Sequence, residues 1–197
     1  MNKFTFKEFL TSNSDLEAGT IEQIVSKCHS ITVSKGDYLL KEGEFATHSF
    51  YIESGLLRQY SIDEKGKEHI IQFAPENWFM SDRESIYFQQ PSAFFIQAME
   101  QTTAYLVDEK FILELAKANP TFLEFNNKLL HNHIRHLQKR INSLLSASAE
   151  ERYLDFIKIY PDLMLRVPQT LIASYLGITP ESLSRVRKEL ALKNHKK

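Results

Sequence analysis

Residues 167–190 read VPQTLIASYLGITPESLSRVRKEL, and this segment decides the fold of the C-terminal part of the chain. It predicts a helix over 168–176, a turn at Gly177 where a positive φ is needed, and a second helix with Pro180 in its first turn. Thr179 is the expected N-cap of that second helix. Each helix would bury an apolar row, and the two rows are Leu171, Ile172, Leu176 and Leu183, Val186, Leu190. The pattern is typical of a helix-turn-helix.

The second helix also carries a polar and basic face. Such a helix fits the major groove of DNA, where Arg185 can pair bidentately with guanine and Glu181 can accept from cytosine N4. The alternative is a basic, solvated helical hairpin. The candidate DNA-binding residues are Thr170, Glu181, Ser182, Ser184, Arg185, Arg187 and Lys188, with Lys193, Lys196 and Lys197 as further phosphate contacts.

Upstream, residues 121–146 predict one long helix. Along it, apolar residues and one Asn recur at alternating steps of four and three, which is a heptad pattern. Ile at one heptad position and Leu at the other favour a parallel dimer, and the Asn helps to fix its register. The alternative is a helix buried in its own domain. We call these residues the heptad row; they are Leu123, Asn127, Leu130, Ile134, Leu137, Ile141 and Leu144.

Residues 1–120 have a different pattern. Seven short stretches rich in β-branched and aromatic residues follow one another, and four of the six glycines fall between them at turns. These stretches predict a jelly-roll or β-roll barrel, so the fold class is α+β. The strands are expected at 31–33, 38–40, 49–52, 56–62, 69–73, 94–99 and 102–107.

Charge and cysteine content exclude several classes of protein. The net charge is −1, but residues 1–120 hold 11 Lys+Arg against 18 Asp+Glu, whereas residues 121–197 hold 13 against 7. Cys28 is the only cysteine, so one chain cannot build an internal disulfide or a cysteine-ligated metal site, and an inert thiol is expected. The sequence shows no catalytic motif, which predicts that the protein is not an enzyme. No apolar run suits a signal peptide or membrane span, which predicts a cytoplasmic protein.

These features together resemble the Crp/Fnr family of bacterial transcription regulators. The most specific likeness is ASYLGITPESLSRVRKEL, residues 173–190, in which Glu181 and Arg185 match the family's base-reading pair. The resemblance implies a sensor domain at 1–120, a dimerisation helix at 121–146 and a helix-turn-helix domain, winged in this family, at 147–197. It also implies double-stranded DNA and a second copy of the chain as partners, with RNA polymerase as a further candidate and no membrane.

The sequence departs from the family in the effector pocket. Cyclic-nucleotide binders of this family carry a Gly-Glu pair and, after a short helix, Arg-Ser-Ala. An ungapped alignment places Met80-Ser81 at the Gly-Glu pair and residues 91–93 at the Arg-Ser-Ala motif. The glutamate and the arginine of the family are therefore missing, and neither Arg58 nor Arg83 has the right spacing to replace the arginine. We therefore expect weak or no binding of cyclic nucleotides, an unknown effector and no cofactor. The candidate pocket residues are Met80, Ser81, Arg83, Pro91, Ser92 and Ala93.

Metal and haem sites are also disfavoured. His131, His133 and His136 do not share one face of the predicted helix, and only the last two could hold a common ligand. The predicted function is a homodimeric DNA-binding transcription regulator. The alternative is a small-molecule sensor whose helical tail contacts protein rather than DNA.

Overall fold

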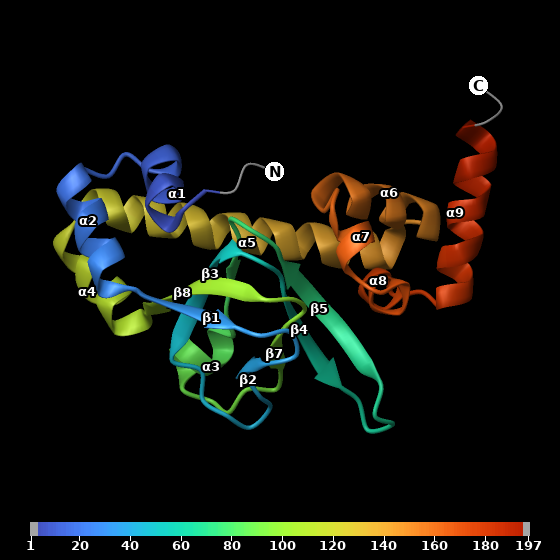
Figure 1. Cartoon of the computed structure of the whole chain (residues 1–197), viewed down its shortest axis with the longest axis horizontal. Coiled ribbons are helices and arrows are strands. Elements are labelled where there is room, and N and C mark those ends of the chain that lie inside the picture. Colours follow the sequence, from blue (N-terminus) through green and yellow to red (C-terminus); the bar gives the residue numbers. More distant parts are fainter. Residues whose placement is uncertain (1–3, 195–197) are drawn as a thin grey trace. The chain divides into compact units, whose positions relative to one another are not determined.

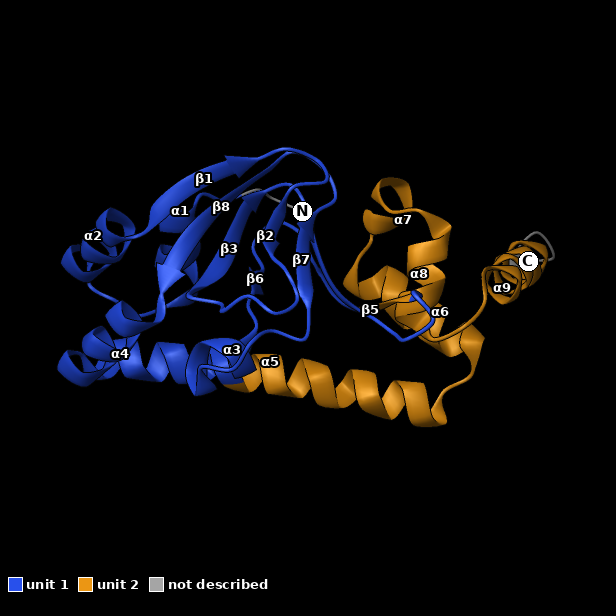
Figure 2. Cartoon of the chain, turned by 90° about the horizontal axis from the view of Figure 1, so that it is seen from below, with its two compact units in different colours: residues 1–67, 71–130 blue, residues 68–70, 131–197 orange. Residues whose placement is uncertain are grey.

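The computed structural model describes residues 4–194 and divides the chain into two compact units. The first unit comprises residues up to 67 together with 71–130, and the second comprises 68–70 together with the residues from 131 onward (Figure 2). Helix α5 (Pro120–Ser146) and strand β5 (Glu68–Ala74) each contribute residues to both units. Each unit is described separately below.

The first unit contains eight strands and several helices (Figure 1). The strands are β1 (His29–Val33), β2 (Tyr38–Leu40), β3 (His48–Ser54), β4 (Leu57–Ile62), β5, β6 (Phe79–Met80), β7 (Phe95–Ala98) and β8 (Thr102–Asp108). The helices besides α5 are α1 (Phe6–Asn13), α2 (Ala18–Lys27), α3 (Arg83–Phe88) and α4 (Glu109–Ala118). All seven predicted strands are present, and only the two-residue β6 was not anticipated.

The strands form two four-stranded sheets, with orders β1-β8-β3-β6 and β2-β7-β4-β5. The paired strands are antiparallel; Phe50, for example, lies opposite Leu106. Gly55 sits in the β3–β4 turn with a φ of 98°, and a Cβ there would lie 2.5 Å from the Thr102 hydroxyl oxygen, so only glycine fits. The predicted β-roll is confirmed.

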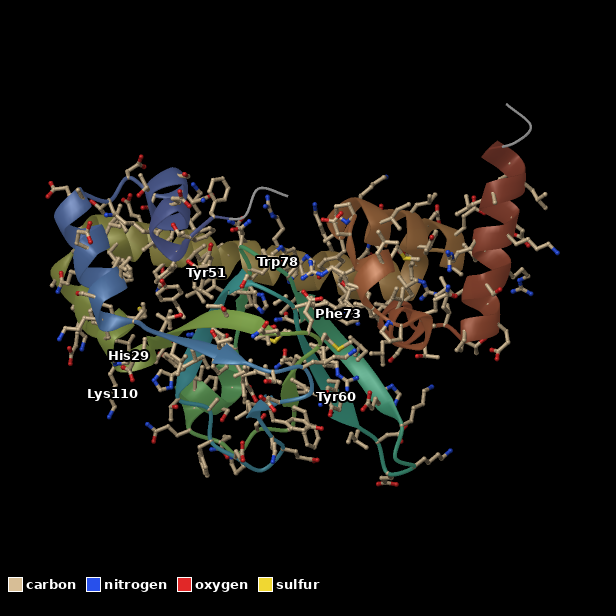
Figure 3. All side chains as sticks on the ribbon, viewed as in Figure 1. His29, Tyr51, Tyr60, Phe73, Trp78 and Lys110 are labelled. Carbon is tan, nitrogen blue, oxygen red and sulfur yellow. The ribbon has the colours of Figure 1, made fainter. Side chains whose placement is uncertain are left out.

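Two apolar clusters stabilise the first unit. One fills the roll and is lined by both sheets, with Ile52, Leu57 and Ile96 fully buried. The other joins α1, α2, α4 and the start of α5 to the roll, around Tyr51, which Figure 3 labels. Phe122 and Phe125 of α5 are buried in this second cluster.

The second unit is helical. It contains the C-terminal part of α5, followed by α6 (Ala149–Ile159), α7 (Leu163–Arg166), α8 (Gln169–Leu176) and α9 (Pro180–Asn194). Ser148 and Glu151 form a capping box at the start of α6. The rings of Phe156, Tyr160 and Tyr175 pack together, with centroids 5.3–5.8 Å apart.

Two details of this unit differ from the sequence-based expectation. The short helix α7 was not predicted. Among the described residues after Asp108 there is no strand, so the wing that accompanies the helix-turn-helix in the resembled family is not found in this part of the chain.

Candidate nucleic-acid interface

The turn between α8 and α9 has the geometry that the sequence predicts. Gly177 ends α8 in the left-handed conformation, with a φ of 65°, and a Cβ there would meet a side-chain carbon of Leu144 at 3.1 Å. The Thr179 hydroxyl accepts from the Ser182 backbone N–H at 3.2 Å and so caps α9. The turn therefore fixes the angle at which α9 leaves α8.

Helix α9 has one buried and one exposed face. Leu183 and Val186 are buried, whereas Leu190 and, on α8, Leu171 are only half-buried rather than core residues as expected. The exposed face consists of residues at helical steps of three and four, namely Glu181, Ser184, Arg185 and Lys188. The structure thus places four of the predicted DNA-binding side chains on one solvent-facing surface, which we call the α9 face.

Glu181 lies at the start of this helix and remains ionised. The pKa of its carboxyl is lowered, first because it accepts a hydrogen bond from its own backbone N–H and second because it interacts with the Thr179 hydroxyl. An ionised carboxylate is purely an acceptor, which suits the exocyclic amine of cytosine.

The other predicted contacts have varied surroundings. Thr170 is exposed on α8, Arg187 is half-buried, and the Ser182 hydroxyl is hydrogen-bonded to that of Thr179 at 3.2 Å. Lys193 contacts both carboxylate oxygens of Glu150 on α6, at 2.8 and 2.9 Å. Lys193 therefore ties the end of α9 to α6 and is a weaker candidate for a phosphate contact. Lys196 and Lys197 lie outside the described residues.

Arg140 of α5 anchors the helix-turn-helix, and sequence reasoning did not identify it. Its guanidinium lies over the Tyr175 ring, 3.8 Å from the centroid, and donates to the Tyr175 carbonyl oxygen at 2.9 Å. It also donates to the Ile70 carbonyl oxygen of β5 at 2.9 Å. The Ser174 hydroxyl of α8 accepts from the Ile70 N–H and donates to the Glu68 carbonyl oxygen, both at 3.1 Å. Helix α8 is thus bonded to α5 and to the start of β5.

The heptad row on α5 is largely uncovered in a single chain. Leu123, Ile134 and Ile141 keep 42%, 48% and 57% of their surface exposed, although they are apolar. Asn127 and Leu144 are also exposed, and Leu130 and Leu137 are half-buried. A row of large exposed aliphatic side chains at heptad spacing is suited to packing against another helix.

The two candidate pocket segments, 80–83 and 91–93, meet where Ser92 bonds to Asp82, but their side chains differ in exposure. Met80 is buried in the roll interior, whereas Pro91 and Ala93 are exposed and Ser81 is half-buried. Arg83 forms a two-point ion pair with Glu109 of α4, at 2.8 and 3.1 Å. Ser92 is buried and donates to Asp82 at 2.6 Å.

Asp82, which the sequence alignment passed over, is a buried carboxylate at the start of α3. It is 3% exposed and accepts from the Ser85 backbone N–H at 3.1 Å as the N-cap of the helix. The sequence signal for it is limited to the residue type, because Asp is one of the residues preferred at an N-cap.

The Cys28 thiol is buried. Burial, and to a lesser extent Asp108, raises the pKa of the Cys28 thiol to about 11. Within residues 4–194 no three His, Cys, Asp or Glu side chains are grouped as metal ligands. No helix in the same range is long and apolar enough to cross a bilayer.

Comparison with known proteins agrees with this arrangement. Residues 30–119, which contain most of the β-roll, match the model of the cyclic nucleotide-binding domain. The chain resembles the anaerobic regulatory protein of Aggregatibacter actinomycetemcomitans, with 28% identity over 78% of this chain and 63% of that protein. It also resembles the fumarate and nitrate reduction regulatory protein of Vibrio cholerae, with 27% identity over 90% of this chain and 73% of that protein. The chain spans about three fifths of the length of the first of these relatives.

Two solved structures share the fold. FixK2 from Bradyrhizobium japonicum superposes with a TM-score of 0.73 at 19% identity, covering 85% of this chain and 86% of FixK2. A protein assigned to the Crp/Fnr family of transcriptional regulators from Eubacterium rectale superposes with a TM-score of 0.67 at 18% identity, covering 93% and 87% of the two chains. The β-roll, the long helix, the helix-turn-helix and these relatives together support the resemblance of this chain to the Crp/Fnr family of transcriptional regulators.

Proposed function

We propose that the chain binds double-stranded DNA sequence-specifically as a parallel homodimer and regulates transcription in that form. The observation that carries the proposal is the α9 face, in which Glu181, Ser184, Arg185 and Lys188 lie exposed on one side of a helix that a glycine turn and a threonine cap hold in place. An exposed helix with base-reading and phosphate-binding groups on one side suits the major groove.

The homodimer is proposed from the heptad row. Burying the exposed side chains of Leu123, Ile134 and Ile141 against a second copy would remove a large apolar surface from water. Two parallel copies of α5 would present two copies of α9 to successive major grooves, about 34 Å apart, on a pseudo-palindromic site.

Cyclic nucleotides are not the proposed effectors. Arg83 is already paired with Glu109, and Asp82 places a buried carboxylate at the start of α3, where a cyclic phosphate would be repelled. Isothermal titration calorimetry with cAMP tests this point, and micromolar affinity would contradict it.

Selection of bound sequences from random duplex DNA, followed by gel shifts at two salt concentrations, tests the DNA-binding proposal. We expect an inverted-repeat consensus and an affinity that falls steeply with salt, because phosphate contacts release counterions. If no sequence is enriched and no salt-dependent shift occurs, the helical tail contacts another kind of partner, such as protein.

A further inference from the structure

Three large aromatic side chains of the first unit are exposed to solvent. Phe45, in the loop between β2 and β3, keeps 59% of its surface exposed. Tyr87 and Phe88, at the end of α3, keep 60% and 67%, and their rings meet edge to face with centroids 5.2 Å apart. Single exposed apolar side chains are ordinary on protein surfaces, whereas grouped ones mark interaction sites. The question is therefore whether Phe45 lies beside α3.

Hydrogen bonds on both sides of Phe45 hold its loop against α3 and against the segment that follows α3. Before Phe45, the Glu44 carbonyl oxygen accepts from the Ser92 backbone N–H at 2.8 Å. After Phe45, the Ala46 backbone N–H donates to the Ser85 hydroxyl of α3 at 2.8 Å. Phe45 is thus fixed between α3 and the segment after it.

Helix α3 is itself fixed at both ends. The Asp82 carboxylate caps its start, where it accepts from the Ser85 N–H at 3.1 Å and from the Ser92 hydroxyl at 2.6 Å. Gln89 ends the helix in the left-handed conformation, with a φ of 52°. Ser85 and Phe88 are three residues apart and so lie on neighbouring turns of the helix. The exposed rings therefore stand together on a fixed frame, and we call them the aromatic patch; they are Phe45, Tyr87 and Phe88.

The size of the aromatic patch fits a short peptide. An aromatic side chain presents about 150–250 Å², so the three exposed fractions leave roughly 400 Å² of aromatic surface open to water. A stable interface between two folded proteins buries about 800 Å² on each partner. The patch is therefore too small to join a second copy of the chain, and it matches a segment that inserts a few apolar side chains.

The acidic side chains on the same segments favour a cationic partner. Glu42 and Glu44 precede Phe45 in its loop, Glu84 lies on α3, and all three are exposed. Exposed carboxylates around an apolar surface attract a positively charged partner and repel a negatively charged one.

The cations of these segments are engaged within the chain. Lys41 lies over the Tyr38 ring, 5.2 Å from its centroid, and Arg83 is paired with Glu109 at 2.8 and 3.1 Å. Lysine and arginine side chains of a partner would also gain from contact with the faces of exposed aromatic rings.

We propose that the aromatic patch is a docking surface for a short peptide segment of another protein, in which apolar side chains are flanked by lysine or arginine. The apolar side chains would cover the three rings, and the cations would meet Glu42, Glu44 and Glu84. An anionic membrane surface does not suit the patch, because the same carboxylates would repel it. The proposal goes beyond DNA binding and does not depend on it.

Selection from a library of random twelve-residue peptides displayed on phage tests the proposal on the full-length protein. Phage that also bind the triple variant Phe45→Ser, Tyr87→Ser, Phe88→Ser are removed before the selection. We expect the peptides that remain to be rich in apolar residues and to carry a positive net charge.

Fluorescence polarisation with one selected peptide then measures single side chains. Tyr87→Ala and Phe88→Ala should each weaken binding about tenfold. Glu84→Gln should weaken it less and should reduce its dependence on salt. Leu113→Ala and Glu114→Gln are the matched controls, because both residues are exposed on α4 of the same unit, and they should leave the affinity unchanged.

Thermal unfolding and sedimentation velocity of the triple variant complete the test. Because the three rings are exposed, the melting temperature and the association state should equal those of the wild type. A lowered melting temperature would assign the rings to the fold, and a changed association state would assign them to a contact between copies; either result overturns the proposal.

The peptide measurements can overturn it as well. They do so if no peptide is enriched on the wild type over the triple variant, if the enriched peptides are acidic, or if the selected peptide binds the patch variants as tightly as the controls. Because DNA takes no part in these measurements, their failure would leave the proposed DNA binding standing.

Discussion

The guanidinium of Arg140 covers the ring of Tyr175 and donates to its carbonyl oxygen, so one side chain of α5 holds the end of α8 in two ways. We expect Arg140→Ala to destabilise the docking of α8 by about 2 kcal/mol, because charge-assisted hydrogen bonds of this kind contribute about 1.5–3 kcal/mol. Amide hydrogen exchange of the α8 backbone measures this directly.

Arg140→Lys should not restore the protection of the α8 amides from hydrogen exchange. A lysine ammonium cannot bond to the carbonyl oxygens of both Tyr175 and Ile70, and it cannot lie flat on the Tyr175 ring. Arg135→Ala is the matched control, because Arg135 is exposed on the same helix and bonds to Asn132. Equal protection of α8 in all four proteins would show that this contact does not hold the helix.

Arg185 and Lys188 share the α9 face but should differ in what they recognise. Arg185→Ala should cost about 1–3 kcal/mol on the preferred DNA sequence and relax the preference at one base pair. Lys188→Ala should weaken binding about equally on all sequences and reduce the salt slope by about one. Quantitative gel shifts on the selected site and on single-base variants distinguish these effects. Wild-type behaviour of both variants would mean that α9 is not the recognition helix.

Ile134 lies near the middle of the heptad row and should be essential for the dimer. Ile134→Asp would bury an unpaired carboxylate in each copy, so the dissociation constant of the dimer should rise about a hundredfold or more. Gln138→Asp, at an exposed position outside the row, should have little effect. Sedimentation velocity over a concentration series measures both. A dimer that is unchanged by Ile134→Asp would rule out the heptad row as the interface.

Local patterns explain why so much of this fold could be predicted. The strands were identifiable because turn glycines interrupt stretches of β-branched and aromatic residues. Helices α8 and α9 were identifiable because a glycine ends the first and a threonine caps the second. Strand β6 has two residues and helix α7 has four, and both were missed because segments this short show no hydrophobic periodicity.

The side chain of Arg140, which holds α8 in place, could not be identified from local sequence patterns. Arg140 meets partners 35 and 70 residues away along the chain, and no local pattern reports such contacts.

Cys28 should be unreactive in the folded protein. Burial raises the pKa of its thiol to about 11, so very little thiolate is present at pH 8. Alkylation by iodoacetamide at pH 8, followed by mass spectrometry, should be slow in buffer and rapid in concentrated urea. Ser26→Cys, on an exposed position of α2, supplies a control thiol that should react quickly in buffer. Equally fast labelling of Cys28 in buffer would contradict its burial.

His136 on α5 should make stability depend on pH in the acidic range. Burial is the largest cause that lowers its pKa from the ordinary value of 6.5, and His133, Arg140 and Lys139 lower it further. Below about pH 6.5 the unfolded chain therefore binds a proton at this position that the folded chain does not, so the stability falls as the pH drops towards the folded pKa. His136→Gln should flatten the decline in urea midpoint between pH 7 and pH 5, whereas His131→Gln, at an exposed position of the same helix, should not. If both variants follow the wild-type curve, protonation of His136 does not control the acid sensitivity of the fold.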